Sequence, residues 1–146
     1  MAETRQFLRL TIAGIDYLLP STAGYTIEQR DNMQVNASPN SRVSGWRVTR
    51  ASRWPAYALE RGFQVTRRDD WQRAVFVEAA PNAIGVIVDE VQVLPRSDMP
   101  VAAFTPLGEP PTRAGHLFSG AAVQERRVTL VLEPRALVAY LQGIGE

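Results

Sequence analysis

The sequence predicts a mostly β fold that ends in one short helix. Short runs of alternating or β-branched apolar residues recur along the chain, Gly and Pro residues separate them, and only the last segment has helical spacing. Many short strands separated in this way are typical of β-barrels or a β-sandwich. With 146 residues, of which 45% are hydrophobic and 21% charged, the chain can bury the core of one globular domain.

The first half of the chain predicts two strand pairs. The expected strands are, in order, residues 7–12, 15–20, 25–27, 43–50 and 53–58. The first two flank Ala13-Gly14, a turn signal, and therefore predict a hairpin. A polar loop that contains Pro39 separates the third strand from the second pair.

The second half predicts further strands and the helix. The expected strands are residues 74–77, 84–88, 117–123 and 128–132. Residues 84–88 are apolar at every position except Gly85, which indicates a strand buried on both faces. Five prolines lie within residues 95–111, so this stretch is expected to be a loop or an edge strand. Pro134 suits the first turn of a helix and Gly143 its end.

The composition excludes several kinds of chemistry. All sixteen basic residues are Arg, Cys is absent, and His116 is the one histidine. A chain without Cys or Lys has no thiolate nucleophile, disulfide or Schiff base, and one imidazole cannot build a multi-histidine metal centre. No cofactor is therefore expected. The apolar runs are too short for a membrane span and no secretory signal is visible, so the expected location is the cytoplasm.

Residues 42–73 concentrate positive charge and aromatic rings. They hold eight arginines against three acidic residues, together with Trp46, Trp54 and Trp71. Basic groups interleaved with aromatic rings can bind single-stranded nucleic acid by phosphate pairing and base stacking. In the other interpretation, this is a partly solvated strand pair whose tryptophans pack in the core. An Arg/Trp-rich nucleic-acid-binding β-barrel module is therefore kept as the alternative function.

Within this segment, Arg47, Arg50 and Arg53 recur at every third residue. If the segment is a β-strand, alternation places Arg47 and Arg53 on one face and Arg50 on the other. Arg50 would then either grip a partner's carboxylate with two hydrogen bonds or form an internal salt bridge. The sequence leaves both possibilities open.

Catalytic groups are sparse. Adjacent carboxylates occur at Asp69-Asp70 and Asp89-Glu90, but neighbouring side chains on a strand point apart instead of facing each other across a substrate. His116 lies at an expected strand edge, and no serine stands in a nucleophile-elbow pattern. A hydrolase that uses Asp69, Asp70 or His116 is a weaker third hypothesis, and the chain is not expected to be an enzyme.

Four segments share their order and spacing with a known family. They are residues 7–20, the central positions Val43, Gly45, Arg50, Pro55 and Leu59, residues 84–91, and residues 128–133 before the terminal helix. Together they resemble the CheW family, the adaptor domains of bacterial chemosensory arrays, over residues 7–141. The central positions match the family pattern V-x-G-x-x-N-L-R-G-x-x-x-P-x-x-D-L, and residues 84–91 resemble its "vGllVDeV" strand.

The chain departs from this pattern in the central motif. Val48 replaces the Asn, Thr49 the Leu, Ala51 the Gly and Ala58 the Asp, and Glu133 replaces an Asp near the end. Alanine at position 51 disfavours any left-handed turn that the glycine would supply. The family uses this region for contacts at the junction of its two barrels, so the departures favour an accessory system such as twitching motility.

The resemblance implies a single domain over residues 1–146, made of two small five-stranded β-barrel subdomains that share a core, with a short C-terminal helix. One barrel would span about residues 15–70, and the other about residues 1–14 plus 71–146. Such an adaptor couples the cytoplasmic tip of a chemoreceptor to the regulatory domain of a CheA-type histidine kinase, with no nucleic acid and no direct membrane insertion.

The resemblance also implies a partner-binding surface. Arg50 matches the family's arginine at the junction between the barrels, and it is the first candidate for partner contact. Its neighbours in the motif would shape the same surface: Val43, Gly45, Arg47, Val48 and Ala51.

Overall fold

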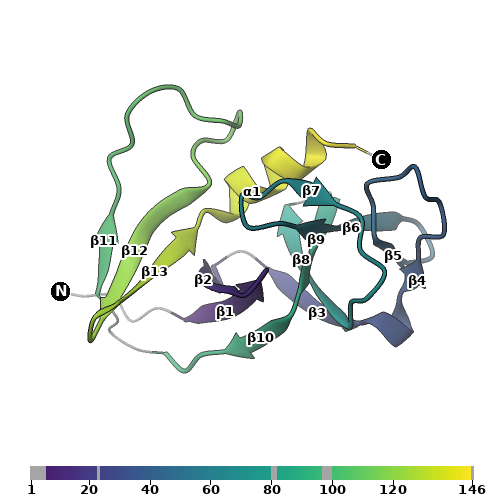
Figure 1. The fold of residues 1–146 in the computed structure, drawn as a ribbon, viewed down its shortest axis with the longest axis horizontal. Coiled ribbons are helices and arrows are strands. Elements are labelled where there is room, and N and C mark those ends of the chain that lie inside the picture. Colours follow the sequence, from purple (N-terminus) through teal and green to yellow (C-terminus); the bar gives the residue numbers. More distant parts are fainter. Residues whose placement is uncertain (1–5, 23, 80–81, 97–99, 146) are drawn as a thin grey trace.

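Most of the regular secondary structure is β-strand, and helix α1 follows the last strand (Figure 1). The computed structural model describes residues 6–22, 24–79, 82–96 and 100–145. The strands are β1 (Phe7–Ile12), β2 (Ile15–Pro20), β3 (Tyr25–Gln29), β4 (Gln34–Val35), β5 (Gly45–Val48), β6 (Arg53–Leu59), β7 (Val65–Thr66), β8 (Arg73–Ala79), β9 (Asn82–Val88), β10 (Glu90–Val93), β11 (Val101–Ala103), β12 (Phe118–Gln124) and β13 (Arg127–Leu132). The 3-10 helix η1 (Arg30–Asn32) follows β3, and α1 spans Pro134–Gln142. The predicted mostly β class with a C-terminal helix is confirmed.

One sheet has six strands in the order β10-β1-β2-β13-β12-β11. The predicted first hairpin is present, because β1 and β2 pair antiparallel around Ala13 and Gly14. These two residues have φ values of 51° and 79°, the left-handed conformation of a tight two-residue turn. Strand β2 also pairs in parallel with β13, and this pairing joins the start of the chain to its last strand.

The other sheet has seven strands in the order β3-β8-β9-β6-β5-β4, with β7 beside β6. Strand β9 lies between β8 and β6, and the side chains of residues 83–88 are buried, as the apolar pattern predicts. Gly85 allows close packing there, since a Cβ atom would lie 2.8 Å from two atoms of the Phe76 ring. The sheet therefore takes its strands from one continuous stretch of chain, residues 25–88.

The predicted division of the chain between the two subdomains differs from the observed sheets. The prediction assigned residues 15–70 to one barrel, but β2 stays beside β1 because a two-residue turn joins them. Strands β8 and β9 pair with β3 and β6, so residues 73–88 belong to the middle sheet instead of the terminal one. The strand numbers are six and seven instead of five each, and the short strands β4, β7 and β11 are among those present.

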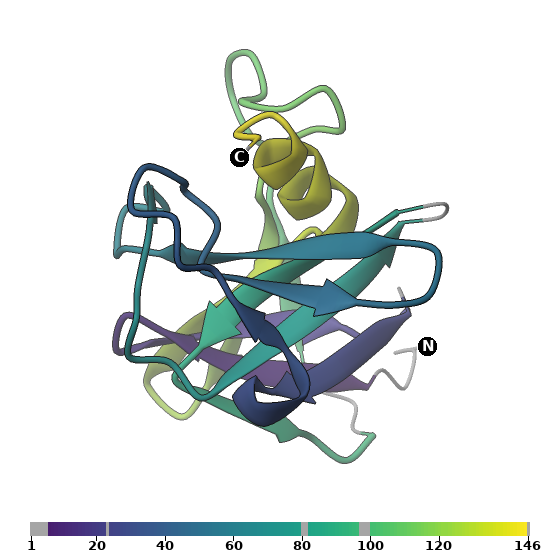
Figure 2. The same ribbon diagram turned by 90° about the vertical axis from the view of Figure 1, so that its right-hand side faces the viewer.

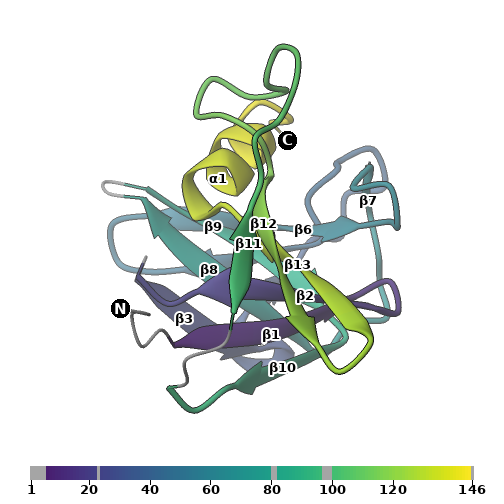
Figure 3. The same ribbon diagram turned by 90° about the vertical axis from the view of Figure 1, so that its left-hand side faces the viewer.

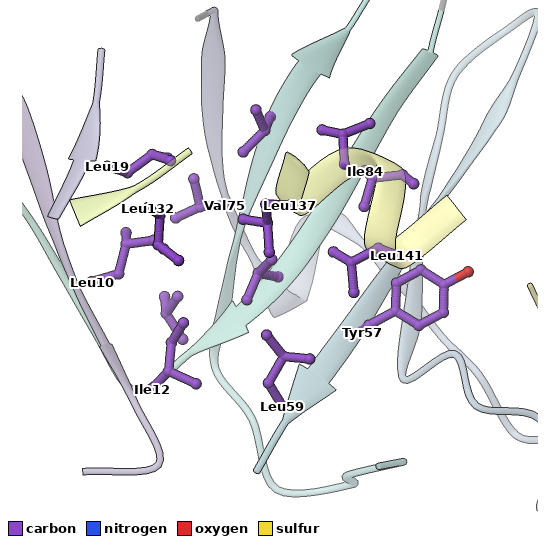
Figure 4. Close-up of a cluster of buried hydrophobic side chains, with 14 of the residues drawn as sticks. Leu10, Ile12, Leu19, Tyr57, Leu59, Val75, Ile84, Leu132, Leu137 and Leu141 are labelled. Carbon is purple, nitrogen blue, oxygen red and sulfur yellow. The ribbon is translucent and has the colours of Figure 1, made fainter. Parts of the chain in front are cut away.

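The core lies mainly between the two sheets, as expected for subdomains that share one. Side chains from both sheets and from α1 meet in this shared core, among them Leu10, Leu132, Tyr57, Val75 and Leu137 (Figure 4). A smaller cluster around Trp71 and Phe76 belongs to the seven-stranded sheet, and another around Phe7 and Leu18 belongs to the six-stranded sheet. Each subdomain thus has its own apolar interior as well as a face in the shared core.

Helix α1 lies above the two sheets in both side views (Figures 2 and 3). It begins as predicted with Pro134 in its first turn, and the carboxylate of Glu133 accepts a hydrogen bond of 2.7 Å from the Ala136 N–H. Gly143 ends the helix at a φ of −71°, so the left-handed freedom of glycine is not used there. The Tyr140 hydroxyl donates to the Phe63 carbonyl at 2.6 Å and ties the helix to the seven-stranded sheet.

The turn between β12 and β13 is strained. Its two residues, Glu125 and Arg126, have φ values of 51° and 133°, in a turn that favours Asn-Gly or Gly-Gly. We expect Arg126→Gly to raise the free energy of unfolding by about 1 kcal/mol, because relief of the strain exceeds the extra entropy of an unfolded glycine. Urea unfolding measures the change. Arg42→Gly, at an exposed position without a left-handed φ, should instead lower stability, and an equal loss in both variants would contradict the strain.

Candidate functional site

The predicted partner-binding residues centre on the turn between β5 and β6, here called the β5–β6 tip (residues 48–52). The two strands pair antiparallel, with Val48 opposite Arg53. The Thr49 N–H donates to the Ser52 carbonyl at 2.8 Å, and the Ser52 N–H donates to the Thr49 hydroxyl oxygen at 3.1 Å. These bonds close the turn without a left-handed residue, so alanine at position 51 is compatible with it.

Two of the six predicted residues lie in the core instead of on the surface. Val43 has no exposed surface, and it packs in the shared core. Gly45 is buried beneath the indole of Trp71, where a Cβ atom would lie 2.6 Å from Cζ2 of that ring. Both positions are buried, so neither belongs to the exposed surface of the β5–β6 tip.

Arg47 is held inside the seven-stranded sheet. Its Nε donates to a carboxylate oxygen of Glu28 on β3 at 3.2 Å, and its guanidinium lies 5.9 Å from the centre of the Phe76 ring. Strands β3 and β5 are separated by three others in the sheet order, so this contact shows how strongly the sheet curls. The pair is partly exposed, and it stabilises the fold by at most about 1 kcal/mol.

Arg50 is exposed in the turn itself. The predicted strand alternation is wrong at this residue, because β5 ends at Val48 and Arg50 is not in a strand. Its neighbour Arg53 lies 3.8 Å from the centre of the Trp46 ring. Within the described part of the chain, the Arg50 guanidinium makes no hydrogen bond or ion pair. The β5–β6 tip therefore presents one uncommitted cation beside the half-exposed Val48 and the exposed Ala51.

Sequence reasoning missed two features of this tip. Thr49 was noted only as a departure from the family motif, yet with Ser52 it forms the hydrogen bonds that set the turn. The sequence does contain a signal for this turn, because a hydroxyl residue three positions before Ser52 can hydrogen-bond across it. The ring of Trp46 beneath Arg53 had no comparable signal, because only the strand register brings the two together.

The tryptophans do not form a platform for nucleic acid. Trp46 is 6% and Trp71 2% exposed, so neither ring is open to a stacked base. Trp54 is partly buried against the Trp71 cluster. Stacking of bases on tryptophan rings, one of the two interactions expected of a nucleic-acid-binding module, is therefore not supported. The tryptophans instead pack in the core, as the other interpretation expects.

The acidic pair and the histidine lie in different parts of the fold. Asp69 and Asp70 are exposed, and they pair with Arg67 at 3.1 Å and Arg68 at 3.3 Å. Partial burial lowers the pKa of Arg68, but hydrogen bonds to Asp89 and Asp70 outweigh it and raise the pKa overall. His116 follows β11 on the other sheet, and among the described residues it makes no contact with these carboxylates. The structure does not assemble the hydrolase site of the third hypothesis.

The described residues include neither a metal-binding cluster nor a membrane-spanning helix. They contain no cluster of three or more His, Cys, Asp or Glu side chains placed to hold a metal ion. Among them, no helix has the length and apolar character that crossing a membrane requires.

Two β subdomains around a shared core, with a helix at the end, make a CheW-like fold. Among solved structures, the chain is similar to the crystal structure of scaffolding protein TtCheW from Thermoanaerobacter tengcongensis. The TM-score is 0.60, the sequence identity is 15%, and the match covers 90% of each chain. No protein-family model and no curated protein matches the sequence. At this identity the likeness establishes the fold alone.

Proposed function

We propose that the chain is a signalling scaffold that couples the cytoplasmic tip of a chemoreceptor to the regulatory domain of a CheA-type histidine kinase. The fold likeness to a scaffolding protein supports a role in assembly. The observation that carries the proposal is the β5–β6 tip, where Arg50 is exposed and has no hydrogen-bond or ion-pair partner among the described residues, while Arg47 and Arg53 are engaged within the fold.

A carboxylate on the partner is the group that this tip would bind. A guanidinium binds a carboxylate with two parallel hydrogen bonds, and arginine is enriched among residues that dominate binding energy at interfaces. Val48, which is 57% exposed, offers apolar contact area next to this charge. The hydrogen-bonded turn fixes the backbone that carries both side chains, which lowers the backbone entropy lost on binding.

The pathway is part of the same proposal. Ala51 and Thr49 change the surface of the tip relative to the family pattern, whereas Ala58 is buried in the Trp71 cluster at the other end of β6. A retargeted tip favours an accessory system such as twitching motility, with the protein acting in the cytoplasm. A scaffold of this kind performs no chemistry and requires no cofactor.

Charge reversal at the β5–β6 tip tests this function. We expect Arg50→Glu to weaken binding to the regulatory domain of the cognate kinase, or to the receptor tip, by at least about tenfold, because a like charge then faces the partner's carboxylate. Isothermal titration calorimetry with each purified partner measures the affinity. Arg42→Glu is the matched control, since it reverses an exposed arginine on the same segment outside the tip.

Two different outcomes would contradict the role of the tip and the proposed function. Equal affinities of Arg50→Glu and Arg42→Glu would remove the β5–β6 tip from the interface. Absence of binding to either partner at micromolar concentrations of the unaltered protein would overturn the proposed function itself. Thermal unfolding of both variants checks that each remains folded.

A further inference from the structure

A cavity of about 810 Å³ opens on the six-stranded sheet, away from the β5–β6 tip. Its lining includes Arg9, Leu18 and Thr129, which alternate along their strands with residues of the shared core such as Leu10 and Leu19. The cavity therefore lies on the opposite face of the sheet from the shared core. Figure 3 shows this side of the molecule, with the long β12–β13 hairpin running beside β2.

The floor of the cavity is apolar, and the hydrophobic cluster beneath it is small. Leu18 and Ala122 are each 3% exposed, and with the partly buried Leu94 they form its base. Among the described residues, Phe7 and Val131 complete this cluster beneath them, and Val101 packs against it. A volume in the range of about 300–1,000 Å³ is typical of small-molecule sites, and the mouth of a β-barrel is one of their usual places. Here the apolar floor is surrounded by side chains that are mostly polar or charged.

The rim carries charge that the fold does not neutralise. Arg9 donates a hydrogen bond to the Gln92 side chain, and Asp16 accepts one from the Thr11 hydroxyl at 2.6 Å. Arg126 and Arg127, by contrast, form no hydrogen bond through their guanidinium groups and no ion pair within the described residues. Three arginines against the carboxylates of Asp16 and Glu125 leave one net positive charge around the opening. A ligand with one negative charge complements this rim.

The strained turn provides a second, independent observation. Arg126 has a φ of 133°, a conformation that glycine adopts far more readily, yet the chain places a long cationic side chain there at the rim. Strain of this kind persists when the surrounding fold enforces it, and it clusters at binding sites. The β12–β13 turn therefore places Arg126 at the opening although the backbone is strained at this residue.

We propose that this cavity binds a small amphipathic carboxylate, with its apolar portion against Leu18, Leu94 and Ala122 and its carboxylate paired with Arg126 and Arg127. The site is on the other sheet from the β5–β6 tip and does not depend on the proposed scaffold function. Binding of such a ligand would let the protein respond to a small molecule as well as to its protein partners.

The experiment measures binding of sodium octanoate to the full chain by isothermal titration calorimetry. We expect saturable binding that is at least tenfold tighter than that of 1-octanol, which has the same chain length without the charge. Arg127→Gln should weaken it about tenfold by removing one guanidinium. Thr129→Phe, which places a bulky ring in the cavity at a position that suits a β-strand, should weaken it at least tenfold. Arg135→Gln, on the exposed face of α1, should leave it unchanged.

Arg126→Gly distinguishes an arginine that binds the ligand from one that only supports the fold. It should weaken octanoate binding while leaving the melting temperature equal or higher, because it removes the ligand contact and the strain together. The proposal requires both Arg127→Gln and Thr129→Phe to weaken binding. No saturable binding of octanoate at 10 mM, binding no tighter than that of 1-octanol, or an unchanged affinity in either variant would overturn it.

Discussion

Leu137→Ala is expected to lower the free energy of unfolding by about 2–5 kcal/mol, the range for removing a leucine side chain from a packed core. Leu137 is 1% exposed, and it projects from α1 into the shared core, where Val75 of one sheet and Leu132 of the other meet (Figure 4). A cavity at this point loosens the helix and both sheets together. The upper part of the range applies because rigid β-strands on two sides cannot collapse into the space.

Urea unfolding measures this loss, and the same helix offers the control. Arg135→Ala removes an exposed side chain two residues earlier and should change stability by less than about 0.5 kcal/mol. A loss below 1 kcal/mol for Leu137→Ala would mean that α1 is dispensable to the shared core. Far-ultraviolet circular dichroism should show the β signal retained in both variants.

Gly45→Ala is expected to lower the free energy of unfolding by about 1–3 kcal/mol, although it adds a single methyl group. The new Cβ atom would lie 2.6 Å from Cζ2 and 2.9 Å from Cη2 of Trp71. That ring is not free to yield, because the Arg30 guanidinium lies 5.1 Å from its centre and also donates to the Trp71 carbonyl at 3.0 Å. The strand, the ring or both must shift.

Two comparisons isolate the cause. Gly62→Ala adds the same methyl group where nothing lies within 4 Å, and it should leave stability unchanged. In a Trp71→Leu background, where the clashing ring atoms are absent, Gly45→Ala should cost less than it does in the native protein. Equal costs in the two backgrounds would contradict the contact with Trp71. The result bears on function, since any effect of Gly45 on partner binding would then act through packing.

Local signals predicted most of the elements. The hairpin of β1 and β2 follows from Ala13-Gly14 between two alternating apolar runs, and the double burial of β9 follows from its unbroken apolar pattern. The start of the helix was readable from Pro134, because proline has a definite preference for the first turn. Gly143 also marks the end, although its φ of −71° is one that any residue adopts. In each case the physical cause acts over a few neighbouring residues, which is the range over which a sequence can be read directly.

The division into sheets was not readable in this way. Pairing of β6 with β9 and of β2 with β13 joins strands far apart in the chain, and nothing in the side-chain pattern of one strand specifies its distant neighbour. The assumption that Arg50 alternates within a strand failed for a related reason. A run of moderate β propensity ended at Val48, where the hydrogen bonds of Thr49 and Ser52 favoured a turn.

The candidate site was predicted in part. Position in a motif identified Arg50 and its neighbours, and the structure places Val48, Arg50 and Ala51 together at the exposed β5–β6 tip. The motif did not separate exposed positions from buried ones, because Val43 and Gly45 share its spacing but lie in the core. The cavity on the six-stranded sheet had no linear signal, since its lining comes from four separate stretches of the chain.

The parallel pairing of β2 with β13 has a consequence for how the protein folds. Tyr17 pairs with Leu130, 113 positions later, and the whole seven-stranded sheet lies within that interval. Closing so long a loop is entropically costly until the intervening chain has become ordered. The continuous middle sheet can form first and bring the two ends together, after which the six-stranded sheet is completed. Folding governed by such distant contacts takes milliseconds to seconds, slower than for helical domains of equal stability.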